Sequence, residues 1–284
     1  MKLNYRRTFL IGLAFMSICA FWQLYDYVVP YILQYTFHFP EGVSGIVMAM
    51  DNLVALFLLP LFGSLSDRVK SPFGRRMPFI VCGTAAAAVL MLLLPAADWT
   101  RNLPMFIVVL ALLLLAMSSY RSPAVALMPD VTPKPLRSAA NAVINLMGAL
   151  GGIFTYAVII LLLPKIDMTT GEKSQSYFTV FAVVAGLMVA SVTILCLTVR
   201  ERKLAALVPP DEDSDAPETS GGRLAPEVRR SLIFILASVA LWYIAFNALS
   251  SAYSRYVLEV WGISEAKGAS MMLVSTAVTT ASYI

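Results

Sequence analysis

Apolar runs of about 20 residues recur along the whole chain, and they restrict its fold more than any other feature. Eight can be read, over residues 8–34, 43–63, 77–97, 104–128, 138–163, 177–199, 230–257 and 268–284. Each is about long enough as a helix to cross a hydrocarbon core of about 30 Å. Backbone amides in lipid must be paired internally, so a spanning chain forms helices or a closed barrel. Because the runs are continuous rather than alternating, they predict an all-α integral membrane protein.

The composition excludes several classes of protein. Only 13% of the 284 residues are charged, which is too few to cover a soluble domain of this size. Cys19, Cys82 and Cys196 lie in separate apolar runs without disulfide or metal spacing, and there is one histidine. No HExxH motif, acid-rich metal motif or nucleophile elbow is present, so we predict neither an enzyme nor a cofactor. The basic residues lie between the apolar runs, so we expect no nucleic acid partner.

The basic residues also predict which end of each span faces the cytoplasm. The N-terminal tail and the second, fourth and sixth connections hold Lys2, Arg6, Arg7, Arg68, Lys70, Arg75, Arg76, Lys134, Arg137, Arg200, Arg202, Lys203, Arg223, Arg229 and Arg230. The other connections hold only Arg101, Lys165, Lys173 and Lys267. Cytoplasmic loops carry the excess of Lys and Arg. This alternation predicts a cell-membrane protein with a cytoplasmic N-terminus.

One segment predicts a division into domains. The stretch "PPDEDSDAPETSGG" is rich in acid, Pro, Ser and Gly, a composition that cannot bury a core. We therefore expect a six-helix bundle over 1–199, a flexible cytoplasmic linker over 200–228 and two further helices over 229–284. A weak repeat agrees, since "RRTFLIG" at Arg6 is echoed by "RRSLIFI" at Arg229. Such repeats are typical of secondary transporters, and the shorter second copy leads us to expect about four more spans beyond Ile284.

The turn between the second and third runs reads "GSLSDRVKSPFGRRMPF" from Gly63 to Phe79. Pro72 and the glycine after it favour a tight return into the membrane, whatever the function. The stretch resembles the corresponding loop of the major facilitator superfamily, roughly Gly-x-x-x-Asp-Arg/Lys-x-Gly-Arg-Arg. The matching residues are Gly63, Asp67, Arg68, Gly74, Arg75 and Arg76. The resemblance implies a latch on the cytoplasmic side, with Asp67 facing a helix of the other half.

A longer spacer after Arg68 is similar to the sucrose-transporter and glycoside–pentoside–hexuronide cation symporter branch. A second stretch, "YRSPAVALMPD" followed by "RSAANAVINLMGALGG", resembles the same branch. Its matching residues are Arg121, Asp130, Asn141 and Gly148. The resemblance implies a monomeric transporter that carries a sugar or glycoside together with H⁺ or Na⁺ by alternating access.

Charges inside the spans mark candidate functional residues, because each costs roughly 2.5–3.5 kcal/mol on insertion scales. Asp51, followed by Asn52, lies in the middle of the second span. It is either a structural carboxylate bonded to neighbouring helices or a cation-coupling group. Related melibiose-type symporters have a second acidic residue one turn away, whereas this chain has Ala55 there. This departure favours H⁺ over Na⁺.

The first span carries a polar and aromatic cluster, with Trp22, Gln23, Asp26 and Tyr27. Aromatic faces can stack on a sugar ring while amide and carboxylate groups bond its hydroxyls; the alternative is an aromatic belt at the membrane interface. Arg121 in the fourth span either snorkels to the interface or pairs with an aspartate or with substrate. The matching arginine of the sucrose-transporter branch implies the second role.

Two asparagines complete the predicted cavity. Asn145 lies on one face of the fifth span with Gly148, Gly152 and Tyr156, and that face either packs or lines a cavity. Asn247 is expected to line the other wall, from the seventh span. Near the outer end of that span, Arg255 and Glu259 are four residues apart and predict an ion pair along the helix with a structural or gating role.

These residues leave three hypotheses for the function. The first is a cation-coupled, and by preference proton-coupled, sugar symporter in the lipid bilayer. The second is an exporter or uniporter of another metabolite or drug, because the same fold carries many cargoes. The third is a non-transporting membrane protein, which a chain of only eight spans would favour.

Overall fold

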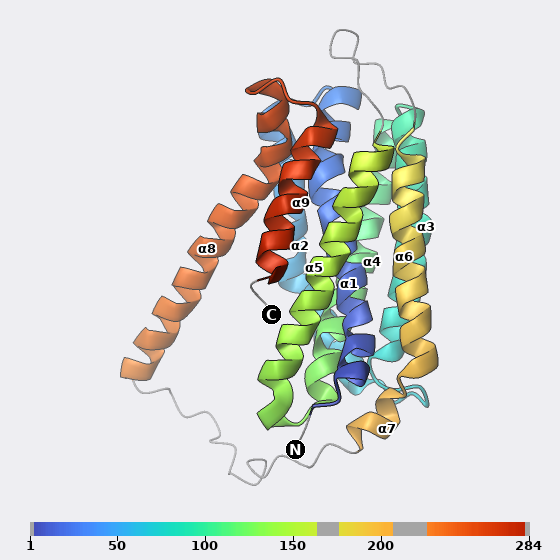
Figure 1. The fold of residues 1–284 in the computed structure, drawn as a ribbon, viewed down its shortest axis with the longest axis vertical. Coiled ribbons are helices and arrows are strands. Elements are labelled where there is room, and N and C mark those ends of the chain that lie inside the picture. Colours follow the sequence, from blue (N-terminus) through green and yellow to red (C-terminus); the bar gives the residue numbers. More distant parts are fainter. Residues whose placement is uncertain (1–2, 164–175, 207–225, 282–284) are drawn as a thin grey trace.

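The computed structural model describes residues 3–163, 176–206 and 226–281, and these residues form helices and turns without a strand. The elements in chain order are α1 (Tyr5–Tyr31), the π-helical turn η1 (Ile32–Thr36), α2 (Glu41–Arg68), α3 (Met77–Trp99), α4 (Leu103–Asp130), the 3₁₀ turn η2 (Lys134–Leu136), α5 (Arg137–Leu162), α6 (Phe178–Thr198), α7 (Glu201–Ala205), α8 (Pro226–Glu259) and α9 (Glu265–Ala281) (Figure 1). Within this described part, seven helical stretches are long and apolar enough to cross a membrane. The predicted membrane helix bundle is confirmed.

The helix boundaries differ from the predicted ones in two places. The eighth apolar run, 268–284, falls on α9, of which 17 residues are described. The segment expected as a linker, 200–228, begins with α7, and its last residues belong to α8. Five residues used above to predict the topology and the chain length lie outside the described residues: Lys2, Lys165, Lys173, Arg223 and Ile284.

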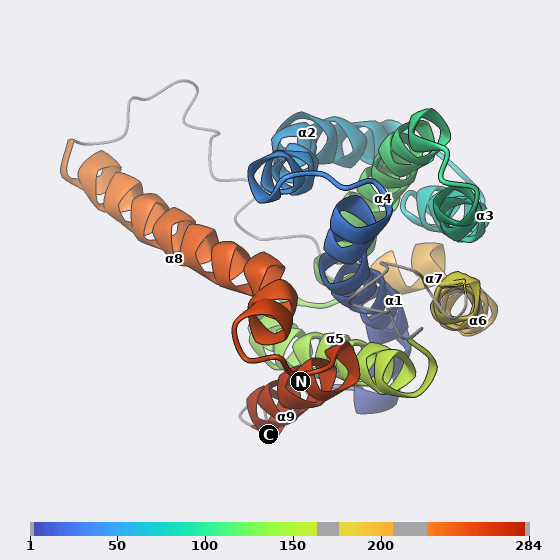
Figure 2. The same cartoon turned by 90° about the horizontal axis from the view of Figure 1, so that it is seen from above.

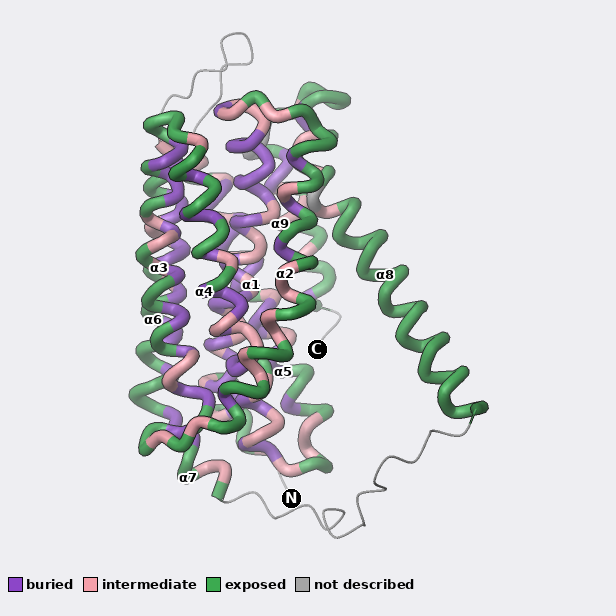
Figure 3. The backbone as a smooth tube through the Cα atoms, turned by 180° about the vertical axis from the view of Figure 1, so that it is seen from behind, coloured by how far each residue is buried: buried purple, intermediate pink, exposed green. Residues whose placement is uncertain are grey.

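Helix α1 forms the centre of the bundle. It packs against α4, α5 and α6 and lies among them when seen from above (Figure 2). More than half of its residues are buried (Figure 3). Its backbone carbonyls satisfy buried hydroxyls of the neighbouring helices: Tyr120 Oη donates to the carbonyl of Ala14 at 2.8 Å, and Thr155 Oγ1 donates to the carbonyl of Ala20 at 3.0 Å. These bonds fix α4 and α5 against α1, since an unpaired polar group in this setting is costly.

Glycines let α5 approach α1 very closely. A Cβ added at Gly151 would lie 2.2 Å from the carbonyl oxygen of Met16, and one at Gly148 would lie 2.8 Å from the ring of Phe15. Gly148 and Gly152 lie on the face that the sequence predicted either to pack or to line a cavity. In the structure Gly151 makes the closest approach, whereas a Cβ at Gly152 would meet only ordinary contacts from 3.4 Å outward.

Helices α8 and α9 form a hairpin beside the main bundle. We call the end of the bundle with the N-terminus and α7 the inner end, at the bottom of Figure 1, and the end with η1 and the α8–α9 turn the outer end. Helix α9 packs along α5, while α8 lies near α1 only at the outer end and diverges from it toward the inner end (Figures 1 and 2). Every residue from 226 to 249 is exposed (Figure 3).

Candidate functional site

Asp51 occupies an unusual position on α2. Only four residues of this helix are buried, Ser44, Met48, Asp51 and Ser66, and Asp51 is 9% exposed. Its apolar neighbours Leu56 and Phe57 are 66% and 68% exposed. A spanning helix normally turns its apolar side chains toward lipid and its charge toward the bundle interior. The arrangement on α2 follows that rule, so Asp51 faces the other helices.

The following residue binds the Asp51 carboxylate. Asp51 Oδ1 accepts hydrogen bonds from the backbone N–H of Asn52 at 2.5 Å and from its Nδ2 at 2.7 Å. Both donors belong to one exposed residue, and both use the same oxygen. The second oxygen of Asp51 has no bond within the described residues. The carboxylate therefore keeps a free acceptor in the bundle interior.

Asp26 on α1 and Arg121 on α4 lie close enough to Asp51 to interact with it electrostatically. Arg121 makes no ion pair with a described carboxylate; its guanidinium carbon lies 5.3 Å from the ring centroid of Trp22. This geometry is a cation–π contact. Three helices thus bring two carboxylates and one guanidinium into one region, where Arg121 lies over the Trp22 ring.

Two buried donors in the same region have no partner. Trp22 Nε1 and Tyr25 Oη are both buried and make no hydrogen bond within the described part of the chain. The Tyr25 side chain interacts electrostatically with both Asp26 and Asp51, and the Trp22 ring lies edge-on to it at 5.4 Å. Leaving a buried donor unpaired costs about 1–3 kcal/mol. These groups are therefore available to a ligand that carries hydroxyl or carboxylate oxygens.

Gln23 is held by a tyrosine of α5. Tyr156 Oη donates to Gln23 Oε1 at 2.6 Å, and the Tyr156 ring packs edge-on against Tyr27 at 6.0 Å. This contact leaves the amide N–H₂ of Gln23 as a donor. Asn145 is half-buried on the same helix as Tyr156 and makes no hydrogen bond with a described residue. The structure therefore places the predicted α1 cluster and α5 side by side.

Asn247 does not join this region. It lies in the exposed stretch of α8, where its Nδ2 donates to the carbonyl of Tyr243 on the same helix at 2.9 Å. The predicted second wall is absent here because α8 has diverged from α1 over this stretch. Only the outer part of α8 approaches, where Tyr253 interacts electrostatically with Tyr156.

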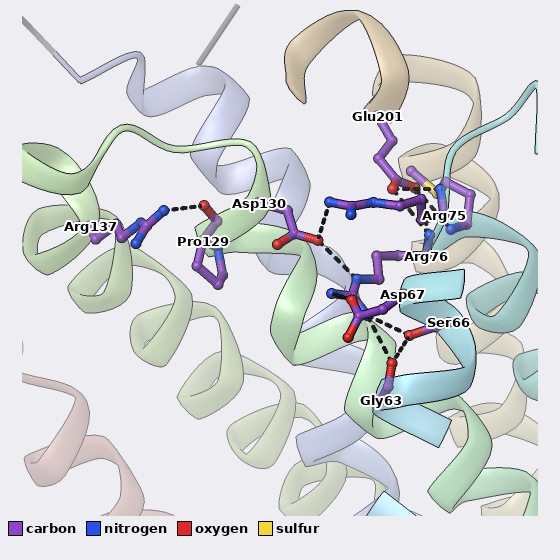
Figure 4. A network of polar contacts seen from close by, with 10 residues as sticks. Gly63, Ser66, Asp67, Arg75, Arg76, Pro129, Asp130, Arg137 and Glu201 are labelled. Carbon is purple, nitrogen blue, oxygen red and sulfur yellow. Dashed lines mark hydrogen bonds and ion pairs between the residues drawn. The ribbon is translucent and has the colours of Figure 1, made fainter. Parts of the chain in front are cut away.

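The charged turn at the inner end forms a network around Arg76 (Figure 4). Arg76 is 5% exposed; its guanidinium lies 2.5 Å from Asp67 Oδ1 and donates through Nε to Asp130 Oδ2 at 2.9 Å. It also contacts Ser66 Oγ and the carbonyl of Gly63. Bidentate and branched contacts of this kind use the fixed fork of a guanidinium. One arginine therefore ties the end of α2 to the start of α3 and the end of α4.

Glu201 of α7 completes the network from the other side. Its carboxylate accepts backbone hydrogen bonds from Arg75 at 2.7 Å, Arg76 at 3.0 Å and Met77 at 3.0 Å. These N–H groups begin α3 and have no partner within that helix. Gly74 makes the approach possible, because its φ is +127° and a Cβ there would lie 2.1 Å from Glu201 Oε2. The carboxylate also complements the positive end of α3.

The remaining motif residues have peripheral positions. Arg75 is half-exposed and its guanidinium lies 3.6 Å from Asp130. Arg68 is exposed in the last turn of α2, where a cation complements the negative helix end. Asp67, which the resemblance implied would face a helix of the other half, pairs with Arg76 and remains 54% exposed on its side chain.

Polar contacts at the outer end connect α1 to its neighbours. Gln34 Nε2 in η1 donates to Glu259 Oε1 at 2.8 Å, and Arg255 donates to Gln34 Oε1 at 3.4 Å. Arg255 and Glu259 thus share Gln34, and no direct ion pair joins them among the described residues. Thr36 donates to the buried carboxylate of Asp98 at 2.6 Å.

Sequence reasoning missed three of these residues. Glu201 is a single acid in the basic run "RERK", and Asp98 is an acid at the end of an apolar run, so both carried a visible signal. Gln34 had none beyond its place near the end of a span. The partner of a polar residue in a distant helix cannot be read from sequence spacing, because it depends on how the helices pack.

Three relatives are similar to parts of this chain. The sucrose transport protein SUC4 of Arabidopsis thaliana is 32% identical over 133 residues, which are 42% of this chain and 26% of that protein. The human proton-associated sugar transporter A is 33% identical over 144 residues, 46% of this chain and 19% of that protein. Human solute carrier family 45 member 3 is 29% identical over 208 residues, 68% of this chain and 36% of that protein. The chain thus aligns with about a third or less of each relative.

The family comparison covers nearly the whole chain. The sequence pattern of the Major Facilitator Superfamily matches residues 10–284. This range includes the charged turn around Arg76 and the described helices that could span a membrane, except for the first residues of α1. Together with the long apolar helices, the match identifies an integral membrane protein. The chain therefore belongs to the major facilitator superfamily.

Proposed function

We propose that this protein is a secondary active transporter that carries a sugar or glycoside together with a proton by alternating access. The observation that carries the proposal is the region formed by Asp26, Asp51 and Arg121. Three separate helices supply two carboxylates and one cation inside the membrane, and two buried donors beside them have no hydrogen-bond partner among the described residues. Ionisable groups in a span mark substrate and ion pathways.

The charge balance supports coupling to a cation. With both aspartates ionised, this region carries one negative charge more than Arg121 neutralises. One bound proton removes the excess, and a carboxylate in a water-poor site can hold a proton and release it when the site opens. Asp51 is the proposed proton carrier, since one of its oxygens has no bond within the described residues. Ala55 supplies no second acid for a Na⁺ site.

The neighbouring side chains support a sugar as cargo. The Trp22 ring offers an apolar face, while Trp22 Nε1, Tyr25 Oη, Asp26 and the free N–H₂ of Gln23 offer hydrogen bonds to hydroxyls. Pockets for small molecules combine apolar walls with a few convergent polar groups in this way. The names of two similar proteins, a sucrose transport protein and a proton-associated sugar transporter, point to the same cargo.

The proposal includes an arrangement in the membrane. Residues 1–199 form the first six-helix bundle, residues 200–228 connect it on the cytoplasmic side, and residues 229–284 begin a second bundle. The excess of basic residues at the inner end supports a cytoplasmic N-terminus in a cell membrane. The protein works as a monomer with one site between its bundles, and Asn247 joins that site when α8 closes on α1.

The test is uptake of radiolabelled sucrose into proteoliposomes that contain the protein purified from its own membrane. We expect an imposed inward proton gradient to drive accumulation, and a Na⁺ gradient at constant pH to drive none. Asp51→Asn should abolish accumulation and leave sucrose exchange between the two sides. Glu227→Gln, a change of an exposed carboxylate at the start of α8, is the matched control and should accumulate sucrose normally.

Each component of the proposal has its own contrary result. Accumulation that persists in Asp51→Asn would remove the coupling role of this residue. Exchange without any gradient-driven accumulation in the unaltered protein would indicate a uniporter. A protein that binds and exchanges no sugar from a panel of mono- and disaccharides would carry another cargo.

A further inference from the structure

A groove lies at the inner end of the molecule, outside the region of Asp26, Asp51 and Arg121. It encloses about 1120 Å³ between the start of α3 and the end of α6. Its floor is mostly apolar and includes Met77, Val81 and Leu197. Its rim carries three basic residues that flank and form α7: Arg200, Arg202 and Lys203.

The groove opens away from the centre of the bundle. Helices α3 and α6 lie on the side of the molecule opposite to α8 (Figure 2). Val81 and Leu197 on its floor are 44% and 80% exposed. Exposed apolar side chains on a spanning helix face lipid chains. The floor therefore lies in the membrane, and the rim lies where α6 ends at Thr198 and the polar chain begins.

The rim has a positive charge that nothing in the described part of the chain neutralises. Among the described residues, no aspartate or glutamate lines the groove, and no carboxylate lies within ion-pair distance of Arg200, Arg202 or Lys203. The adjacent Glu201 is 2% exposed and its carboxylate is turned to the backbone N–H groups of α3. The nearby Arg76, by contrast, has Asp67 and Asp130.

We propose that this groove binds an anionic phospholipid, with the phosphate at Arg200, Arg202 and Lys203 and an acyl chain along Val81 and Leu197. Basic pockets between helices on the cytoplasmic side of membrane proteins suit such head groups. A soluble anion would use only the rim and would leave the apolar floor empty. A zwitterionic lipid would use the floor but would not neutralise the three cations. The proposal is independent of the cargo and of the coupling ion.

The first test measures lipid retention by native mass spectrometry of the purified protein, released from nanodiscs of equal parts phosphatidylglycerol and phosphatidylcholine. We expect phosphatidylglycerol to be retained in preference. The variant Arg200→Gln/Arg202→Gln/Lys203→Gln should lose that preference by roughly fivefold for each cation removed. The control Arg6→Gln/Arg7→Gln/Arg229→Gln removes the same charge at the inner end, outside the groove, and should keep the preference. An equal loss in both variants would overturn the proposal, because it would show attraction to surface charge alone.

A second variant tests the apolar floor. Val81→Trp fills the groove on a half-exposed position, so the fold should survive, which far-UV circular dichroism and the melting temperature check. We expect weaker retention of phosphatidylglycerol with all three rim cations in place. Unchanged retention of phosphatidylglycerol would overturn the proposal that an acyl chain lies along the floor of the groove.

Two further results would assign the groove to another occupant. Inorganic phosphate at millimolar concentration that displaces the lipid would identify a site for soluble phosphate. In the second result, the unaltered protein shows no preference for phosphatidylglycerol, and a variant in which the five acidic residues at 211–218 are neutralised does show one. The acidic segment of the chain itself would then be the occupant, and the lipid proposal would fall.

Discussion

At the scale of single residues, Arg76 has an unusually large set of polar partners, with two carboxylates, a hydroxyl and a carbonyl around one guanidinium. Three helices meet at this side chain. A guanidinium can donate to acceptors on all three helices because its N–H groups point in fixed, divergent directions, which an ammonium group cannot reproduce.

We predict that Arg76→Gln lowers the free energy of unfolding by about 1.5–3 kcal/mol, the range for hydrogen bonds to charged groups. The estimate stays below that for a fully buried pair because Asp67 is half-exposed. Chemical unfolding in detergent, followed by tryptophan fluorescence, measures the change. Arg76→Lys should recover less than half of the loss. The control Arg68→Gln removes an exposed arginine of the same motif and should change stability by no more than about 0.5 kcal/mol.

A separate prediction concerns Glu201, because its carboxylate accepts hydrogen bonds from backbone N–H groups rather than from side chains. Glu201→Gln replaces one acceptor oxygen by an N–H₂ group that faces other donors, so we expect a loss of about 1–3 kcal/mol. Glu201→Asp should not restore it, since the shorter side chain withdraws the carboxylate from the start of α3. The matched change Glu227→Gln, at an exposed position, should leave the melting temperature unaltered. Equal melting temperatures for the Glu201 and Glu227 variants would contradict this reading.

These residues also show which parts of the site could be predicted from the sequence. The spacing of Gly63, Asp67, Gly74 and the two arginines was sufficient to locate the inner turn. It could not reveal Glu201, which is more than a hundred residues away and meets the turn only through the packing of α6 against α3. The burial of Asp51 was predictable from its charge within an apolar run, whereas the contact of Arg121 with Trp22 was not.

At the scale of helices, the approach of α5 to α1 gives the sharpest prediction. Gly151→Ala places a methyl group against the carbonyl of Met16, and a backbone atom cannot move aside as a flexible side chain can. We expect a destabilisation of about 1–3 kcal/mol from overpacking, measured by thermal unfolding in detergent. Gly186→Ala on α6 is the control, because no described atom outside the local helix backbone lies within 4 Å of a Cβ there. A destabilisation of the same size at Gly186 would mean that the loss of glycine, rather than the contact, is responsible.

The long helices were predictable because lipid leaves the backbone almost no alternative, and their ends fell within a few residues of the apolar runs. The short elements were not predictable in this way. The helix α7 has five residues, and the π-helical turn η1 follows Pro30 without a signal of its own in the hydropathy pattern. Both elements position functional contacts, since α7 carries Glu201 and η1 carries Gln34. Their location depends on tertiary contacts rather than on local preference.

At the scale of the whole molecule, the two ends of the bundle differ in how α8 meets α1. At the outer end Gln34 bridges to Glu259 and Arg255, while toward the inner end α8 diverges (Figure 1). Alternating access requires one side to be closed while the other is open. Within the proposed transport cycle, these contacts fit an arrangement closed at the outer end. In the proposed transport cycle one chain adopts both arrangements, so a sequence pattern does not encode which of them the structure has.

The contact between Gln34 and Glu259 at the outer end predicts that a cross-link there blocks transport reversibly. In a variant with serine at Cys19, Cys82 and Cys196, the pair Gln34→Cys/Glu259→Cys should cross-link with a short bifunctional thiol reagent. The control pair Arg6→Cys/Ser231→Cys lies at the inner ends of α1 and α8, which have separated, and should cross-link far less. If α8 must leave α1 at the outer end to admit substrate, the cross-linked outer pair will take up no sugar, and a cleavable linker will restore uptake. Full uptake by the cross-linked protein would show that this contact never opens, and rocking of the two bundles at the outer end would have to be abandoned.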